Sequence, residues 1–231
     1  MRRAAGATLQ PGERAGCEPV DEATDGRTSP TERANVGVLI LGGGEATRLP
    51  GKLELDAGAF PMLARVFQNL SPGRETWLAG KGSLAPGLDS LIPAPVAVDR
   101  WSLRGPLAGL ITTMGQMRAR WVFAVAGDAP LIEGSFIERL LAERRPGDEA
   151  VVPIHDRDGK RQPEPLAALY DRLSFLREGF PVVRRGGAAL RKVIDRLQVR
   201  YVEIDDPRIF TNVNTPHDYA ALLEIFERER R

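Results

Sequence analysis

The sequence has little cysteine, almost no net charge and no long apolar run, and each of these absences excludes a class of protein. A single cysteine, Cys17, cannot form an internal disulfide, so a disulfide-stabilised secreted domain is not expected. Lys and Arg number 32 against 31 Asp and Glu, which gives no sign of a nucleic-acid-binding surface. No apolar run approaches the roughly 20 residues of a membrane-spanning helix, so we expect no membrane partner. Arg2 and Arg3 precede no apolar stretch, so we predict no secretory signal and expect a cytoplasmic protein.

Residues 1–34 differ in composition from the rest of the chain. They are rich in Gly, Pro, Thr, Glu and Arg and contain no aromatic residue. Such a segment buries too little apolar surface to offset its conformational entropy, so we predict a disordered tail, with a docking tail as the alternative. Residues 35–231 are then expected to form one domain, since 42% of the chain is hydrophobic and 27% is charged.

Short apolar runs alternate with amphipathic segments from residue 36 onward. We expect strands at 36–41, 75–79, 95–99, 121–126, 150–154, 166–170 and 199–204. We expect helices at 61–70, 107–117 and 135–143, and a last helix that starts at Thr215–Pro216. This alternation predicts an α/β protein with a Rossmann-like three-layer α/β/α fold and a mainly parallel sheet. Strand 166–170 is a candidate to run antiparallel.

The first strand runs into a glycine-rich loop, Leu41-Gly42-Gly43-Gly44, which Arg48 and Lys52 follow. Consecutive glycines allow backbone amides to approach phosphate oxygens, and the two cations would neutralise a triphosphate. The spacing excludes the P-loop, because six residues separate Gly44 from Gly51 and no Ser or Thr follows the lysine. A glycine-rich turn without a ligand is the alternative.

Two acidic residues are expected at the ends of strands. Asp99 closes the strand at 95–99, and the segment Gly105-Pro106-Leu107 then begins a helix. Asp128 follows the buried strand 121–126, where a carboxylate needs a cation or hydrogen-bond donors. Mg²⁺ bridging nucleotide phosphates would supply that cation, which makes Asp128 the candidate metal ligand. The alternatives are a tightly packed helix start at Gly105 and a turn capped by Asp128.

The distal half contains amide and histidine side chains. Asn212 and Asn214 precede the last helix and offer donors and acceptors for an acceptor substrate, although turn and cap chemistry is the alternative. His155 and His217 have no metal-ligand spacing, so we expect exposed positions in a loop or at a helix start. Gln162 and Glu164 are expected in a solvated turn.

The motifs together resemble those of the molybdenum cofactor guanylyltransferases, a nucleotidyltransferase family. The resemblance covers about residues 36–220 and runs, in family order, through the glycine loop, Gly105-Pro106-Leu107-Ala108-Gly109, Gly127-Asp128-Ala129-Pro130, Pro165–Tyr170 and Asn212-Val213-Asn214-Thr215-Pro216. The sequence departs from the family pattern in the glycine loop. Gly42 replaces the usual Ala, the segment from Arg48 to Lys52 is one residue short, and Gly51 stands where an Asp usually precedes the lysine.

The resemblance implies transfer of GMP from GTP to a molybdopterin-type molybdenum cofactor, with release of diphosphate. It also implies a role for each motif. The nucleotide would be contacted by Leu41, Gly42, Gly43 and Gly44, and its guanine and ribose would be bordered by Gly105, Pro106 and Leu107. The triphosphate would be stabilised by Lys52 and Arg48, while nucleotide and Mg²⁺ would be held by Asp99 and Asp128. The acceptor would be contacted by Asn212 and Asn214. Molybdoenzyme maturation proteins are further candidate partners. The alternatives are a related transferase that uses CTP or a sugar or alcohol phosphate, and a nucleotide-binding module without catalysis.

Overall fold

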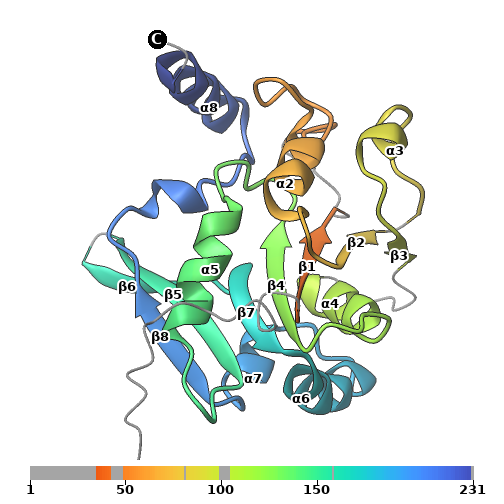
Figure 1. Cartoon of the computed structure of the whole chain (residues 1–231), viewed down its shortest axis with the longest axis vertical. Coiled ribbons are helices and arrows are strands. Elements are labelled where there is room, and N and C mark those ends of the chain that lie inside the picture. The colour runs from red at the N-terminus through yellow and green to blue at the C-terminus, as the bar shows by residue number, and fades with distance from the viewer. Residues whose placement is uncertain (1–34, 43–48, 81, 99–104, 158, 230–231) are drawn as a thin grey trace, which may run out of the picture.

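The protein is built around one eight-stranded mixed sheet, seen in a computed structural model that describes residues 35–42, 49–80, 82–98, 105–157 and 159–229 (Figure 1). The strand order is β3-β2-β1-β4-β7-β5-β6, and β8 pairs with β5. The strands are β1 (Val36–Leu41), β2 (Thr76–Gly80), β3 (Val96–Val98), β4 (Trp121–Ala126), β5 (Ala150–Arg157), β6 (Lys160–Pro163), β7 (Ala167–Asp171) and β8 (Val199–Glu203). The helices are α2 (Met62–Leu70), α3 (Leu88–Leu91), α4 (Pro106–Met114), α5 (Gly134–Glu143), α6 (Arg172–Arg184), α7 (Arg191–Ile194), the 3₁₀ helix η1 (Pro207–Phe210) and α8 (Pro216–Glu229).

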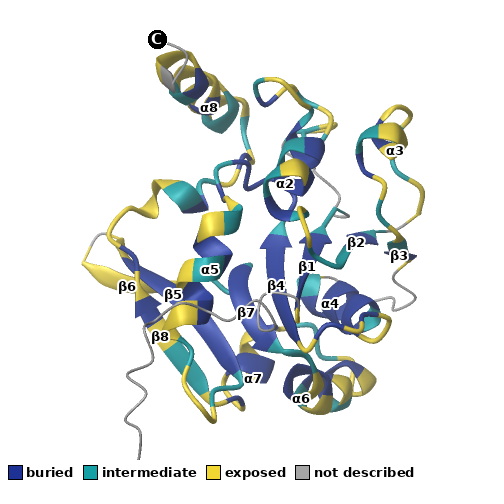
Figure 2. Cartoon of the chain, viewed as in Figure 1, coloured by how far each residue is buried: buried dark blue, intermediate teal, exposed yellow. Residues whose placement is uncertain are grey.

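The centre of the sheet is parallel and buried on both faces. β1 pairs in parallel with β2 on one side and β4 on the other. Because side chains alternate along a strand, Ile40 packs in one core with α2 and α5, whereas Leu39 packs in a second core with α4 and α6. Figure 2 shows the resulting buried strands between more exposed helices. The predicted three-layer α/β/α architecture is therefore confirmed.

The other half of the sheet contains antiparallel pairs. β7 runs antiparallel to both β4 and β5, with Tyr170 opposite Val122 on one side and Ala150 on the other. The antiparallel direction suggested for strand 166–170 is thus confirmed. β5 also forms an antiparallel hairpin with β6 and pairs in parallel with β8.

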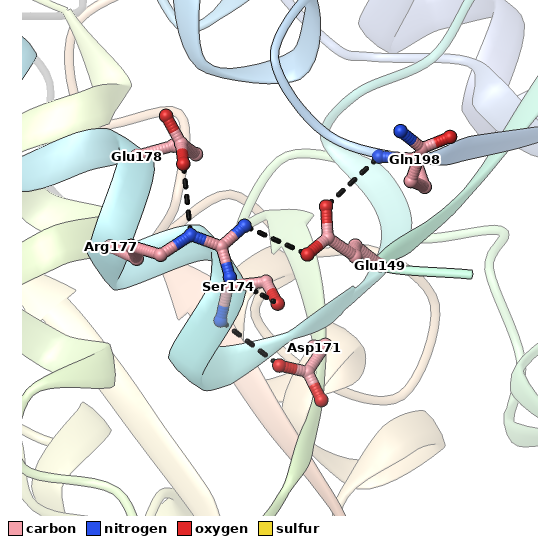
Figure 3. Close-up of polar contacts among 6 residues, drawn as sticks. All are labelled: Glu149, Asp171, Ser174, Arg177, Glu178 and Gln198. Carbon is pink, nitrogen blue, oxygen red and sulfur yellow. Dashed lines mark hydrogen bonds and ion pairs between the residues drawn. The ribbon is translucent and has the colours of Figure 1, made fainter. Parts of the chain in front are cut away.

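Helix α6 was not predicted, and a polar network fixes its start. Asp171 caps it by accepting a 3.0 Å hydrogen bond from Ser174 N. Figure 3 shows the Arg177 guanidinium between Glu178 and Glu149, to whose Oε1 it donates at 2.8 Å. Arg177 holds the pKa of Glu149 below its usual value, because the hydrogen bond stabilises the carboxylate. The helix also tolerates Pro181 in its interior.

His155 contradicts its prediction as an exposed loop residue. It lies on β5, is buried, and its Nε2 is 3.0 Å from Oε1 of Glu164. The His155 ring also stacks on Phe210, with 5.5 Å between centroids. Glu164 therefore has a structural partner and is not simply solvated. His217, by contrast, is exposed at the start of α8, as predicted.

Among the described residues, no helix is both long enough and apolar enough to cross a membrane. The predicted tail at 1–34 lies outside the described residues.

Candidate functional site

The carboxyl ends of β1 and β4 lie side by side and form the edge at which the candidate site is built. Leu41 pairs with Ala126 at the last position of the two strands. Beyond the strands, Gly127 N donates a 3.0 Å hydrogen bond to Leu41 O, and Gly42 N donates to Ala79 O of β2 at 2.9 Å. In open α/β sheets, ligands bind beyond such carboxyl ends, so this edge is the expected binding edge.

Gly127 brings Asp128 to this edge through a close backbone approach. A Cβ atom at Gly127 would lie 2.8 Å from Leu63 Cδ1 and 2.9 Å from Leu41 O. No larger residue fits there without displacing β1, β4 or α2. In the sequence, Gly127 stands out only as part of the motif Gly127-Asp128-Ala129-Pro130. The position of a glycine between a buried strand and its acidic residue is the signal that could have identified its role.

Three polar side chains from distant parts of the chain converge at the edge, and we call them the polar cluster: Lys52, Asp128 and Asn214. The Lys52 ammonium donates to the Asp128 carboxylate and, at 2.8 Å, to Asn214 Oδ1. The Lys52 and Asp128 side chains are only 16% and 12% exposed. A carboxylate this enclosed is destabilised unless a cation faces it, and Lys52 provides that charge.

Gly51 gives the turn before Lys52 its shape. Its φ of 68° lies in the left-handed region, which glycine adopts far more easily than Asp or other residues with a side chain. Glu54 N then donates to Gly51 O at 3.0 Å, and Leu63 N donates to Leu53 O at 3.0 Å. The glycine that replaces the usual Asp is therefore accounted for by the backbone of this turn.

Asn214 is held in place by the backbone on one side and a helix cap on the other. Val213 N donates to Asp128 O at 3.0 Å, and the Val213 side chain is fully buried. Asp218 accepts from Asn214 N at 3.0 Å and from Thr215 N at 2.8 Å, while Thr215 Oγ1 accepts from Asp218 N. These bonds form a reciprocal cap at the start of α8 and keep the pKa of Asp218 below its usual value, with the Asn214 amide as the main cause.

The α8 helix is fastened to the body of the protein close to the polar cluster. Leu222 and Phe226 pack with Met62 of α2 in a small apolar cluster. The Arg65 guanidinium lies 4.1 Å from the centroid of the Phe226 ring, and Tyr219 Oη donates to Asp56 O at 2.8 Å. This packing fixes the segment that carries Asn214.

The predicted helix start at Gly105-Pro106-Leu107 lies beside the same strands. Gly105 has a φ of 109°, and a Cβ atom there would be 3.3 Å from Ala188 O. Pro106 occupies the first turn of α4, and Gly109 lies close enough to β1 that its Cβ would be 3.4 Å from Leu41 Cδ2. Leu107 is fully buried in the core.

The structure brings together only part of the predicted site. Lys52, Asp128 and Asn214 meet, and Leu41 and Gly42 lie at the same strand edge. Asn212 is exposed. Four predicted residues lie outside the described residues: Gly43, Gly44, Arg48 and Asp99.

The polar cluster offers oxygen ligands of the kind that a hard cation prefers. The described residues contain no group of three or more His, Cys, Asp or Glu side chains that could hold a metal alone. Asp128 and Asn214 nevertheless direct one carboxylate and one amide oxygen at a single cation. Mg²⁺ commonly uses one or two protein oxygens, with substrate phosphates and water completing its shell, so the donor set fits that ion.

Comparison with known proteins places the chain among nucleotide-dependent transferases. Residues 38–202 match the family model described as MobA-like NTP transferase domain. The molybdenum cofactor guanylyltransferase of Burkholderia ambifaria strain MC40-6 is 32% identical over 196 residues, which cover 80% of this chain and 93% of that protein. A probable molybdenum cofactor guanylyltransferase of Carboxydothermus hydrogenoformans is 30% identical over 207 residues, which cover 83% of this chain and 97% of the relative.

Solved structures share the fold. Molybdopterin-guanine dinucleotide biosynthesis protein A from Archaeoglobus fulgidus superposes with a TM-score of 0.70 at 24% identity, covering 83% of this chain and 99% of that one. The 2-C-methyl-D-erythritol 4-phosphate cytidylyltransferase of Thermus thermophilus gives a TM-score of 0.63 at 13% identity, with coverages of 84% and 99%. The fold is therefore common to transferases named for different nucleotides.

Proposed function

Because the chain belongs to the MobA-like NTP transferase family, we propose that it transfers GMP from GTP to a molybdopterin-type molybdenum cofactor and releases diphosphate. The observation that carries the proposal is the convergence of Lys52, Asp128 and Asn214 at the carboxyl ends of β1 and β4. Each of these side chains is suited to a phosphate, a metal ion or a polar substrate. Together they lie where α/β sheets bind nucleotides.

In this reaction the protein has to position the substrates and neutralise charge, because the acceptor phosphate is itself the nucleophile. The terminal phosphate of the acceptor attacks the α-phosphorus of GTP, a new phosphoanhydride bond forms, and the bond to the departing diphosphate breaks. Catalysis then depends on alignment of the two substrates and on stabilisation of the negative charge that develops on the leaving group. In this proposal Lys52 supplies positive charge to the triphosphate, and Arg48 supplies more from the glycine-rich loop.

Asp128, with Asn214 beside it, would hold Mg²⁺ next to the nucleotide. When bound, the ion neutralises phosphate charge and orients the triphosphate. Asp128 would orient the ion through its carboxylate, and its buried surroundings keep that carboxylate in one place. Asp99 belongs to the same proposal as a further nucleotide or metal contact, and Asn212 as a contact to the acceptor.

The choice of GTP rests on the curated relatives, which are named guanylyltransferases. A cytidylyltransferase shares the fold, so CTP is the specific competitor. Calorimetric titration with GTP, CTP and UTP in Mg²⁺ tests the choice. We expect GTP to bind at least about tenfold more tightly than CTP, a difference of roughly 1.4 kcal/mol. A preference for CTP would overturn the guanylyl assignment.

Transfer itself needs a separate measurement. Incubation of the protein with GTP, Mg²⁺ and molybdenum-loaded molybdopterin is expected to release diphosphate in proportion to the dinucleotide formed. Binding of GTP without diphosphate release would instead support a nucleotide-binding module without catalysis. The proposal places this reaction in the cytoplasm, with molybdoenzyme maturation proteins as recipients of the product and without nucleic acid or membrane as partners.

A further inference from the structure

Lys52 occupies a position that suits a divalent cation. Its ammonium is bonded both to the Asp128 carboxylate and, at 2.8 Å, to Asn214 Oδ1. We propose that Lys52 holds the place of the metal ion in the nucleotide-free protein and moves to the triphosphate when the nucleotide binds. Metal and nucleotide would then bind cooperatively, each favouring the other. This inference rests on the proposed function only in taking the nucleotide to be a triphosphate.

Charge and geometry make Lys52 and a metal ion compete for the same two oxygens, those of Asp128 and Asn214. The Asp128 carboxylate carries one negative charge in an enclosed position, and Asn214 adds a neutral oxygen. Two cations at this pair of oxygens would repel each other at short range, which in a poorly solvated site is strongly unfavourable. A metal ion therefore has to displace Lys52 before it can use both oxygens.

A metal ion that entered alone would cost the displaced Lys52 ammonium its enclosed ion pair with Asp128. Of the other carboxylates nearby, Asp218 is engaged by the amides of Asn214 and Thr215. Glu54, two residues along the chain from Lys52, is exposed, so an ion pair with it would be weakened by solvent. A bound triphosphate changes this balance, because its oxygens offer Lys52 a stronger anionic partner.

The same reasoning applies in the other direction. If the nucleotide bound alone and attracted Lys52, Asp128 would be left enclosed and without a cation. A metal ion that arrives with the nucleotide removes that cost. The two ligands therefore share one coupling free energy, which must be the same whichever binds first.

Titration with Mn²⁺, a spectroscopically visible analogue of Mg²⁺, tests the proposal by electron paramagnetic resonance. Lys52→Met retains the long apolar side chain and removes the ammonium. Without nucleotide, we expect Lys52→Met to bind Mn²⁺ at least about tenfold more tightly than the unaltered protein, within the usual range for coupled sites. The unaltered protein should approach that affinity only in the presence of GTP.

The control is Lys160→Met, the same substitution at an exposed lysine on β6. It should bind Mn²⁺ like the unaltered protein. The double variant Lys52→Met/Asp128→Asn should lose the gained affinity, which assigns the gain to the Asp128 site. Thermal unfolding of each variant verifies that it is folded.

Two results would overturn the proposal. One is a Lys52→Met protein that binds Mn²⁺ no more tightly than the unaltered protein, and the other is unaltered protein whose Mn²⁺ affinity does not respond to GTP although GTP binds. Either result leaves the proposed transferase function intact if diphosphate release persists. Absence of GTP binding at saturating Mn²⁺ would instead contradict both the coupled binding and the proposed transferase function.

Discussion

The Lys52 ammonium donates a 2.8 Å hydrogen bond to Asn214 Oδ1, although 162 positions separate the two residues in sequence. Lys52 lies in the turn before α2, and Asn214 lies in the segment before α8. The Lys52 ammonium also donates to the carboxylate of Asp128, just beyond β4, and the amide of Val213, the neighbour of Asn214, donates to Asp128 O. The chemistry of the site therefore depends on three separate segments of chain that are fixed by independent contacts.

Asp128→Asn should abolish most turnover without unfolding the protein. The amide keeps the shape of the side chain and removes the charge that faces Lys52 or a metal ion. We expect kcat to fall about 10²–10³-fold, comparable with loss of one charge-stabilising group in other active sites. Steady-state diphosphate release measures this, with the exposed Asp205→Asn as a matched control that should keep its rate. Near-normal turnover of Asp128→Asn in Mg²⁺ would contradict the assigned role.

Gly127→Ala should destabilise the protein and also impair the site. The new methyl group would meet Leu63 Cδ1 at 2.8 Å and Leu41 O at 2.9 Å, and the backbone oxygen cannot move away freely. We expect a loss of about 1–3 kcal/mol in the free energy of unfolding, the range for overpacked sites. Urea unfolding measures the loss. Gly82→Ala is the control, because nothing lies within 4 Å of its added Cβ; equal stability of the two variants would refute the steric argument.

Asp218→Asn should lower stability at neutral pH and have less effect in acid. The folded-state pKa of Asp218 is depressed, chiefly by the Asn214 amide, so its carboxylate stabilises the fold at pH values above the unfolded pKa of about 4. That contribution is lost as the pH falls through the folded-state value. At pH 7 the variant should lose about 1 kcal/mol, or 2–4 °C in Tm.

Tm measurements of both proteins from pH 7 down to pH 3 test the Asp218 prediction. The difference between them should narrow below about pH 4, as the native Asp218 becomes protonated. A difference that stays constant over this range would show that the charge of Asp218 does not contribute.

Tyr170→Phe should weaken the fold and leave turnover nearly unchanged. Tyr170 is fully buried, and its hydroxyl donates to Pro165 O at 2.8 Å. Burial holds the pKa of Tyr170 above its usual range, so the hydroxyl remains a neutral donor. Its removal deprives the half-buried Pro165 carbonyl of this donor and should cost about 0.5–1.5 kcal/mol of unfolding free energy. The control Tyr201→Phe, at an exposed position on β8, should unfold like the unaltered protein; a similar loss there would argue against the buried hydrogen bond as the cause.

The central strands could be predicted from sequence because their apolar runs are continuous. The predicted strands 36–41 and 121–126 have the bounds of β1 and β4. Both are buried along almost their entire length, so no polar residue interrupts the pattern. Gly42 after the first run, and Gly127 with Asp128 after the second, marked where each strand ends.

The sequence did not predict the helices and strands that depend on contacts with distant parts of the chain. β6 is fully exposed and mostly polar, so pairing with β5 and not burial defines it. Pro181 obscured α6, since proline in a helix interior removes a hydrogen bond and usually ends the helix. His155 was predicted to be exposed because it has no metal-ligand spacing in the sequence, whereas the fold brings Glu164 and Phe210 to it as partners.

The sequence predicted which residues form the candidate site better than it predicted how they contact one another. Lys52, Asp128 and Asn214 were each named from a motif, but their mutual contacts were not. Strand order brings β1 beside β4 and explains how Asp128 reaches the glycine-rich edge. The position of Asn214 depends on the path through η1 and on the packing of α8, for which the sequence gives no comparable rule.

The late position of Asn214 in the chain has a consequence for biosynthesis of the protein. A growing polypeptide that has reached the end of β8 already contains Lys52, Asp128 and every strand of the sheet, but it lacks Asn214 and the α8 helix that secures it. The segment after β8 must therefore leave the ribosome before the third side chain can join the other two. Competence for chemistry is acquired only after the strands β1 to β8, which support it, have been made.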